Sequence, residues 1–251
     1  MEQNAATPVI ILAEPQMGEN IGAVARAMAN FGLSDLRLVR PRDKWPNKKA
    51  YPMAAGADAI LDKARVYETV AVAIADLTRV FATTARTRTM VKPLVSPEEA
   101  GQRCHAEIAQ GRGCGYLFGG EKSGLDNEDV TLCDAIITIP TSSFSSLNLA
   151  QAVLICGYTW FNSRPQRTDT TPVFPEGDEN TRPATKEELT ALCEHLEREL
   201  DAAGFLYPPE KRPSMVRNLR NIWARAGLAD QEVRTLRGVI TALVRRRKGD
   251  A

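Results

Sequence analysis

Short apolar runs alternate with amphipathic segments along most of the chain, and this alternation predicts strands separated by helices. Runs such as Val9–Ala13 and residues 135–139 are apolar throughout and rich in β-branched residues, which is typical of strands buried on both faces. Residues 21–32 and 97–110 carry small and apolar residues at helical spacing. Strands that alternate with helices predict an α/β fold built on a mostly parallel sheet.

The elements of this fold can be placed along the chain. Strands are expected at residues 9–13, 35–39, 79–83, 115–118 and 135–139, with Val66 in a further strand. Helices are expected at residues 21–32, 53–63, 71–76, 97–110 and 147–160. The last of these is apolar all round, as expected of a buried helix. Ligands of such sheets bind at loops beyond the carboxyl ends of the strands, which here follow Thr83, Phe118 and Ile139.

A change in composition separates a smaller C-terminal part. We expect residues 1–162 to form the α/β domain and residues 163–184, which are rich in proline, threonine and charge, to form a linker. Residues 185–251 are expected to form a small α-helical extension. Its first helix begins with the capping-box pair Thr185 and Glu188, and two more helices are expected at residues 214–226 and 230–246.

The overall composition, with 43% hydrophobic and 25% charged residues, is that of a folded globular protein. No apolar run approaches the ~18 residues needed to span a bilayer, and the polar N-terminus does not resemble a signal peptide. We therefore expect a cytoplasmic protein without membrane contact. The five cysteines are an odd number without a C-x-x-C pair, which favours buried free thiols and predicts no metal site.

The net charge of +1 hides a strong asymmetry towards the C-terminus. Residues 211–248 contain eleven lysines and arginines against two acids, a balance of +9. Residues 185–210 contain two bases against seven acids, a balance of −5. Such segregation is typical of a surface that binds a polyanion, and it is equally compatible with a solvated helix face.

Three segments carry polar or glycine residues that packing alone does not require. Asn20 and Arg26 lie six residues apart at the start of a helix of small residues. The arginine either forms a salt bridge or binds an anion. Residues 117–125 place two glycines directly after a strand, which lets a ligand approach the backbone closely. Residues 141–152 place serines and Asn148 at the start of the buried helix, and the serines are expected to cap its backbone N–H groups.

Together these segments resemble the signatures of the TrmH (SpoU) branch of the SPOUT superfamily of RNA methyltransferases. N-x-x-x-x-x-R is found at Asn20 and Arg26, F-G-x-E-x-x-G-L at residues 118–125, and S-S-L-N-L-A-x-A at residues 145–152. The Thr-Thr-Ala-Arg-Thr-Arg loop at residues 83–88 and the helical extension are similar to those of the TrmJ subgroup. Members of that subgroup methylate the ribose of nucleotide 32 in the tRNA anticodon loop.

The resemblance implies a tRNA 2′-O-methyltransferase that uses S-adenosyl-L-methionine and works as a homodimer, with the active site completed across the interface. It also implies a deep trefoil knot at the C-terminal side of the α/β domain, forming the cofactor pocket. The residues expected to hold the cofactor are Thr83, Thr84, Ala85, Gly119, Ile139, Ser145, Ser146 and Leu147. The residues expected to serve catalysis are Arg26, Asn20, Glu121, Ser146 and Asn148.

Arginine is effectively always protonated, so we expect Arg26 to grip a phosphate and stabilise the developing 2′-alkoxide rather than to act as a base. A glutamate or a water then accepts the proton of the 2′-hydroxyl. Glu121 either takes part in catalysis or accepts hydrogen bonds from the backbone N–H groups of its own loop. We expect RNA phosphates to be contacted by Arg86, Arg88, Lys92, Arg217, Arg220 and the loop at residues 42–49. The alternative is that these residues only form solvated surface.

Other functions are alternatives to this interpretation. The same signatures occur in enzymes that methylate ribosomal RNA, and they do not separate the two substrates. A non-catalytic RNA-binding member of the family is disfavoured by the intact Arg26, Glu121, Ser146 and Asn148. An α/β enzyme acting on a metabolite is disfavoured because neither a Walker loop nor a G-x-G-x-x-G fingerprint is present.

Overall fold

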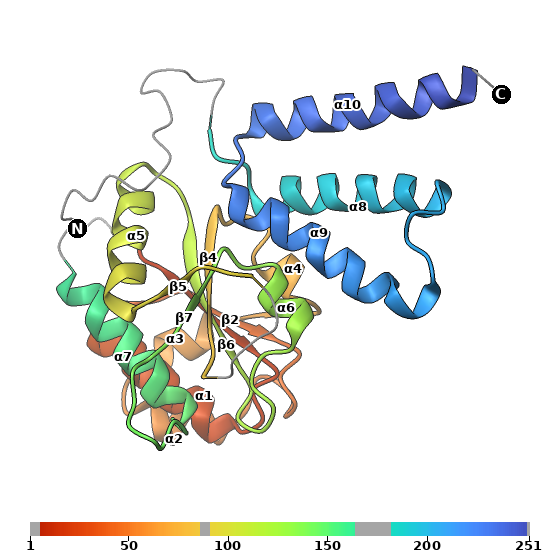
Figure 1. Ribbon diagram of the computed structural model, residues 1–251. Coiled ribbons are helices and arrows are strands. Elements are labelled where there is room, and N and C mark those ends of the chain that lie inside the picture. Colours follow the sequence, from red (N-terminus) through yellow and green to blue (C-terminus); the bar gives the residue numbers. More distant parts are fainter. Residues whose placement is uncertain (1–5, 86–90, 164–181, 250–251) are drawn as a thin grey trace.

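A computed structural model describes residues 6–85, 91–163 and 182–249 of the chain (Figure 1). The strands are β1 (Val9–Ala13), β2 (Leu36–Val39), β3 (Arg65–Tyr67), β4 (Arg79–Thr83), β5 (Leu94–Val95), β6 (Cys114–Gly119) and β7 (Ala135–Ile137). Within the described residues they form one seven-stranded sheet in the order β3-β2-β1-β6-β4-β7-β5. Every neighbouring pair is parallel, which confirms the predicted parallel α/β fold.

Alternate residues of the buried strands pack against helices on opposite faces of the sheet, as the two-residue period of a strand requires. The face that includes Ile10 and Leu12 is covered by α1 (Gly18–Asn30), α2 (Ala50–Ala54), α3 (Asp58–Asp62), α5 (Pro97–Ala109) and α7 (Leu149–Asn162). The face that includes Ile11 is covered by α4 (Val70–Ala73) and α6 (Asn127–Thr131). The sheet is therefore the central layer of a three-layer sandwich (Figure 1).

Three short regions depart from the sequence-based expectation. The single helix expected at residues 53–63 is wrong, because Ala55 and Gly56 have φ values of 49° and 97° and divide it into α2 and α3. Neither β5 nor α6 was anticipated. With two and five residues, these elements are too short for a hydrophobic pattern to repeat recognisably, so periodicity could not find them.

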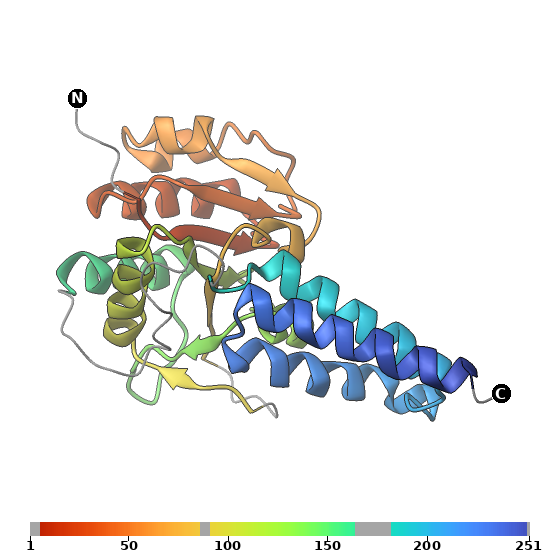
Figure 2. The same ribbon diagram turned by 90° about the horizontal axis from the view of Figure 1, so that it is seen from above.

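The C-terminal part consists of α8 (Lys186–Ala202), the 3₁₀ turn η1 (Pro209–Lys211), α9 (Arg212–Ala226) and α10 (Asp230–Gly249). The predicted capping box is confirmed, since Thr185 Oγ1 accepts from the Glu188 N–H at 3.2 Å and the Glu188 carboxylate accepts from the Thr185 N–H at 2.9 Å. Leu192 and Val233 are buried in a small core between these helices. Figure 2 shows the helices side by side, projecting away from the α/β layers.

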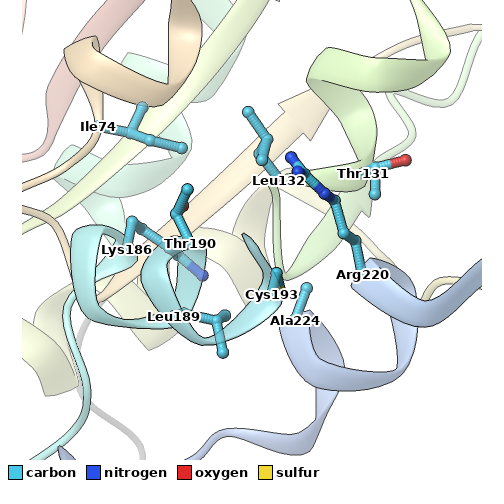
Figure 3. A pocket seen from close by; sticks show the side chains of 9 residues that line it. All are labelled: Ile74, Thr131, Leu132, Lys186, Leu189, Thr190, Cys193, Arg220 and Ala224. Carbon is cyan, nitrogen blue, oxygen red and sulfur yellow. The ribbon is translucent and has the colours of Figure 1, made fainter. Parts of the chain in front are cut away.

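These helices are attached to the sheet at the amino ends of its strands. The Lys186 N–H donates to the carbonyl of Leu77, just before β4, at 3.0 Å. The Lys186 Nζ donates to Asp134, just before β7, at 2.6 Å. A cavity of only about 20 Å³ remains at this joint, where side chains of α8 and α9 meet Ile74 and Leu132 (Figure 3). It has room for about one water molecule, so the joint is closely packed.

Candidate functional site

A hollow of about 380 Å³ lies at the carboxyl ends of β4, β6 and β7, within the size range of small-molecule sites. Because β4 pairs with β6 on one side and β7 on the other, the loops that follow these strands converge. The hollow is lined by all the residues expected to hold a cofactor, namely Thr83, Thr84, Ala85, Gly119, Ile139, Ser145, Ser146 and Leu147. The remaining lining residues are Phe118, Gly120, Glu121, Lys122, Gly124, Leu149 and Ala152.

A chain of hydrogen bonds joins the three sequence motifs beside this hollow. The Asn148 Nδ2 donates to the Asn20 Oδ1 at 3.1 Å, and the Asn20 Nδ2 donates to the Glu121 Oε1 at 2.6 Å. The second carboxylate oxygen, Glu121 Oε2, accepts from the backbone N–H of Gln16 at 2.8 Å. The start of α1, the loop after β6 and the start of α7 are thus held together by these side chains.

The start of α7 differs from the expected serine cap. Asn148 is the N-cap residue, since its Oδ1 accepts from the Ala150 N–H at 2.9 Å. The Gln151 side chain accepts from the Asn148 N–H at 3.0 Å and completes a capping box. The expectation that serines cap this helix is therefore wrong. Ser145 and Ser146 lie in the preceding loop, where their hydroxyls are exposed at the hollow.

The two glycines at the end of β6, Gly119 and Gly120, line the hollow and are also required by the loop itself. A Cβ at Gly119 would lie 2.1 Å from the carbonyl carbon of Gly124, and one at Gly120 would lie 2.3 Å from the Glu14 oxygen. The loop closes through a hydrogen bond of 2.8 Å from the Gly124 N–H to the Gly120 oxygen. Both glycines are therefore required by backbone contacts within the protein.

Glu121 and Arg26 occupy contrasting environments. Both carboxylate oxygens of Glu121 accept hydrogen bonds, and the donors belong to Gln16 and Asn20 rather than to its own loop. Arg26 is exposed on α1, and among the described residues its side chain makes no hydrogen bond or ion pair and does not line the hollow. Gln16 was missed by sequence analysis, because a backbone donor leaves no signal in residue identity.

A second set of charged groups lies beside the loop after β6. Glu14 and Arg40 follow β1 and β2 with φ values of 52° and 46°, a conformation that non-glycine residues rarely adopt. The Arg40 Nε donates to Glu14 at 3.0 Å, and its guanidinium lies 4.0 Å from Asp129. Burial, together with the charge of Asp126, raises the pKa of Asp129 to about 6, although Arg40 opposes this shift.

Several of the side chains expected to contact RNA are already bound by other groups of the protein. Arg86 and Arg88 lie outside the described residues. Arg217 donates to Glu128 at 2.7 Å, and Arg220 donates to both oxygens of Glu197 at 2.6 and 2.8 Å. The expected phosphate contact of Lys92 is wrong, because this side chain is 8% exposed and donates to the carbonyls of Thr131 and Cys133 at the end of α6.

Other sequence-based expectations concern cysteines, metals and membranes. The five cysteines are buried and free, as predicted. In the described ranges, no group of three or more histidine, cysteine, aspartate or glutamate side chains is arranged to hold a metal ion. No helix in the described part of the chain is both long and apolar enough to cross a membrane.

Comparisons with known proteins match both parts of the chain. Residues 7–158 match the family model of the SpoU rRNA methylase family. The chain belongs to the SpoU rRNA methylase family. Within this family it is of the TrmJ type, since residues 187–251 match the C-terminal domain of the tRNA methyltransferase TrmJ.

Individual SpoU family members support this assignment along nearly the whole chain. The tRNA (cytidine/uridine/adenosine-2′-O-)-methyltransferase TrmJ of Pseudomonas aeruginosa (strain UCBPP-PA14) is 35% identical, with 92% of this chain and 91% of that protein aligned. The tRNA (cytidine/uridine-2′-O-)-methyltransferase TrmJ of Escherichia coli (strain K12) is 34% identical over 96% of each chain. The crystal structure of TrmJ from Z. mobilis ZM4 is 47% identical, with a TM-score of 0.84 over 95% of this chain and 99% of that one.

Proposed function

We propose that this chain transfers a methyl group from S-adenosylmethionine to a ribose 2′-hydroxyl of tRNA, at nucleotide 32 of the anticodon loop. The observation that carries the proposal is the hollow at the carboxyl ends of β4, β6 and β7, where the three motif segments meet. The relatives of TrmJ type are named as tRNA 2′-O-methyltransferases, which favours tRNA over ribosomal RNA as the substrate.

The hollow fits the cofactor in its chemistry. The Thr83 hydroxyl is buried at its wall beside the Cys156 thiol, and it has no nitrogen or oxygen partner among the described residues. The exposed hydroxyls of Ser145 and Ser146 supply polar contacts that a ligand in the hollow can reach. Ala85, Ile139 and Leu147 supply apolar contacts on other walls. When bound, the sulfonium of the cofactor supplies an already activated methyl group, so the chemistry requires no metal.

Arg26 is the residue we assign to charge stabilisation. It stays protonated, binds a phosphate of the substrate RNA and stabilises the negative charge that develops on the 2′-oxygen. Both oxygens of Glu121 are already hydrogen-bonded, which favours a water molecule as the acceptor of the 2′-hydroxyl proton. Asn20, Glu121 and Asn148 act as positioning residues that keep the three motifs together, while Ser146 faces the hollow.

A homodimer completes the site in this proposal. The outer face of α7 exposes large apolar side chains, with Leu154, Tyr158 and Phe161 at 39%, 57% and 62% exposure. Exposed apolar patches of this kind are typical of protein interfaces. Arg26 lies outside the lining of the hollow in its own chain, and we assign it to the hollow of a second copy packed on this face.

Two further features belong to the same proposal. The first is that the α/β domain contains the trefoil knot that the family resemblance implies. Residues 1–162 form the methyltransferase domain, residues 163–184 the linker, and residues 185–251 an extension that binds tRNA.

Mass spectrometry of tRNA treated with the protein and S-adenosylmethionine tests this function. Unmodified tRNA and ribosomal RNA are offered in parallel, and the methylated nucleotide is mapped in each. One methyl group on the ribose of nucleotide 32 in tRNA is the expected result. Methylation of ribosomal RNA alone would refute the assigned substrate. Cofactor binding without methylation of either RNA would refute the assigned reaction.

A further inference from the structure

The loop between β2 and α2 carries exposed cations that the described part of the protein does not neutralise. In residues 42–49, which we term the ridge, Arg42, Lys44 and Lys48 are exposed and make no side-chain ion pair or hydrogen bond with any described residue. Lys49 has one ion-pair partner, Glu19, at 3.8 Å, and its side chain is 68% exposed. Such an exposed pair contributes little. The ridge therefore presents a net positive surface.

The ridge is held rigidly against the first half of α1. The Arg42 N–H donates to the Pro15 oxygen at 3.0 Å. Asn47 packs so closely on Gly18 that a Cβ there would lie 2.5 Å from the Asn47 Cγ. Gly22 makes an equally close approach, since its Cβ would lie 1.9 Å from the Ala50 oxygen. The neighbour of Gly22 is backbone, so only glycine permits this approach, whereas the neighbour of Gly18 is a side chain. The Gly22 contact and the Arg42 hydrogen bond thus hold both ends of the ridge against α1.

The only acid of the ridge is engaged within it. The Asp43 carboxylate accepts from the Asn47 Nδ2 at 3.2 Å, and the Asn47 Oδ1 accepts from the Lys49 N–H at 3.0 Å. Trp45 is half-buried and packs against the core beneath the cations. These contacts order the loop in advance, which lowers the entropic cost of binding a ligand.

The ridge lies next to the candidate site. Its anchor on α1, Gly18, is two residues before Asn20, whose amide binds Glu121 in the lining of the hollow. The C-terminal helices, by contrast, attach at the amino ends of the strands through Lys186. A five-residue strand such as β4 spans ~17 Å. In one chain, the joint of these helices is therefore separated from the hollow by the length of a strand.

The geometry points to the ridge as the surface that binds RNA phosphates flanking the acceptor nucleotide. The inference rests on the proposed function and deepens it, because a ribose seated at the hollow brings its neighbouring phosphates to the same edge of the sheet. Unpaired lysines and arginines held on a rigid backbone suit phosphate contacts, which fix position without reading sequence. An acidic protein segment would also suit cations, and the test below separates it from RNA.

Charge reversal of the ridge tests the inference. The variant Arg42→Glu/Lys44→Glu/Lys48→Glu leaves the Lys49–Glu19 pair and the α1 anchors intact. We expect its tRNA affinity near 0.15 M salt to fall by about 30-fold or more, and the slope of log affinity against log salt to shrink by about 2 to 3. Cofactor affinity and melting temperature are expected to stay near the values of the unaltered protein.

A single-residue comparison supplies the matched control. Lys44→Glu and Lys63→Glu each reverse one exposed lysine that has no ion pair among the described residues, and only Lys44 lies in the ridge. KM for tRNA is expected to rise for Lys44→Glu and not for Lys63→Glu.

The outcomes separate the ridge from the proposed function. Unchanged tRNA affinity and salt slope in the triple variant would overturn the ridge as an RNA surface, and methylation of tRNA by the same variant would leave the proposed function standing. If the unaltered protein methylates no RNA, the proposed function fails, while the binding measurements still decide whether the ridge contacts RNA.

Discussion

The two edges of the central sheet differ in how their polar groups are satisfied. At the carboxyl edge, the Thr83 hydroxyl lacks a nitrogen or oxygen partner among the described residues, and Glu14 and Arg40 hold left-handed backbone conformations. At the amino edge, charged groups are paired. Glu107 is 1% exposed and accepts from Arg79 and Arg112 at 2.8 and 2.7 Å.

This difference assigns function to the carboxyl edge of the sheet and stability to its amino edge. Groups left unpaired or in strained conformations persist only where the surrounding structure holds them, and they gather at functional sites. Paired groups at the opposite edge fix the attachment of the C-terminal helices, since Asp134 accepts from both Lys186 and the Val80 N–H. Substitutions at the amino edge should therefore lower stability, whereas substitutions at the carboxyl edge should change activity or relieve an unfavourable interaction.

The largest effect is expected from Glu107→Ala at the amino edge. It leaves Arg79 and Arg112, which are 18% and 13% exposed, without their shared carboxylate. Breaking a buried ion pair in this way costs about 3–5 kcal/mol, which lowers the melting temperature by about 10 °C in a chain of this size. Thermal unfolding measures the change, with Glu98→Ala on the exposed side of α5 as the control.

The pH dependence of this variant sharpens the same test. Burial acts to raise the pKa of Glu107, but Arg79 and Arg112 outweigh burial and hold the pKa below its usual value. The carboxylate therefore contributes stability above its unfolded pKa of about 4.5, and the contribution is lost as pH falls through the folded pKa. The difference between Glu107→Ala and the unaltered protein should shrink below about pH 4. An equal melting temperature at neutral pH would contradict the assigned role.

Arg26→Lys on α1 is expected to act on turnover alone. The lysine keeps the charge but loses the planar fork, so kcat for tRNA methylation should fall by about 100-fold, or about 2.7 kcal/mol in the barrier. The melting temperature and cofactor affinity should not change, because the side chain makes no hydrogen bond or ion pair among the described residues. Turnover equal to that of the unaltered protein would argue against bidentate positioning.

The residues of the candidate site could be predicted from the sequence because each motif is local. Ser145, Ser146 and Leu147, for example, are adjacent in the chain and line the hollow together. The sheet order could not be predicted, since pairing of β4 with both β6 and β7 depends on contacts between distant segments. The motifs thus identified which residues meet without explaining the path that brings them together.

The physical role of individual residues was predicted less well than their location. Arg220 was expected to contact phosphate, but its guanidinium is bound to Glu197, which lies 23 residues away on another helix. The glycines at the end of β6 line the hollow, and Gly120 has a second role beside the Glu14 carbonyl that the sequence did not indicate. In both cases the deciding neighbour is distant in sequence, so composition and spacing contain no record of it.

The smallest effect is expected from Asp129→Asn, at the carboxyl edge. The folded pKa of Asp129, about 6, lies above the ordinary aspartate value of 3.8, so the fold favours the protonated form. This group therefore contributes stability at low pH that is lost as pH rises through about 6. Asparagine resembles the protonated side chain and should raise the free energy of unfolding by about 1 kcal/mol near pH 8, with no gain near pH 4. Urea denaturation at both pH values measures this, and Glu98→Gln, at an exposed carboxylate without an ion pair among the described residues, is the control. A loss of stability near pH 8 would instead mean that the Asp129 carboxylate is held mainly by Arg40, and the carboxyl edge would then be as well paired at this position as the amino edge.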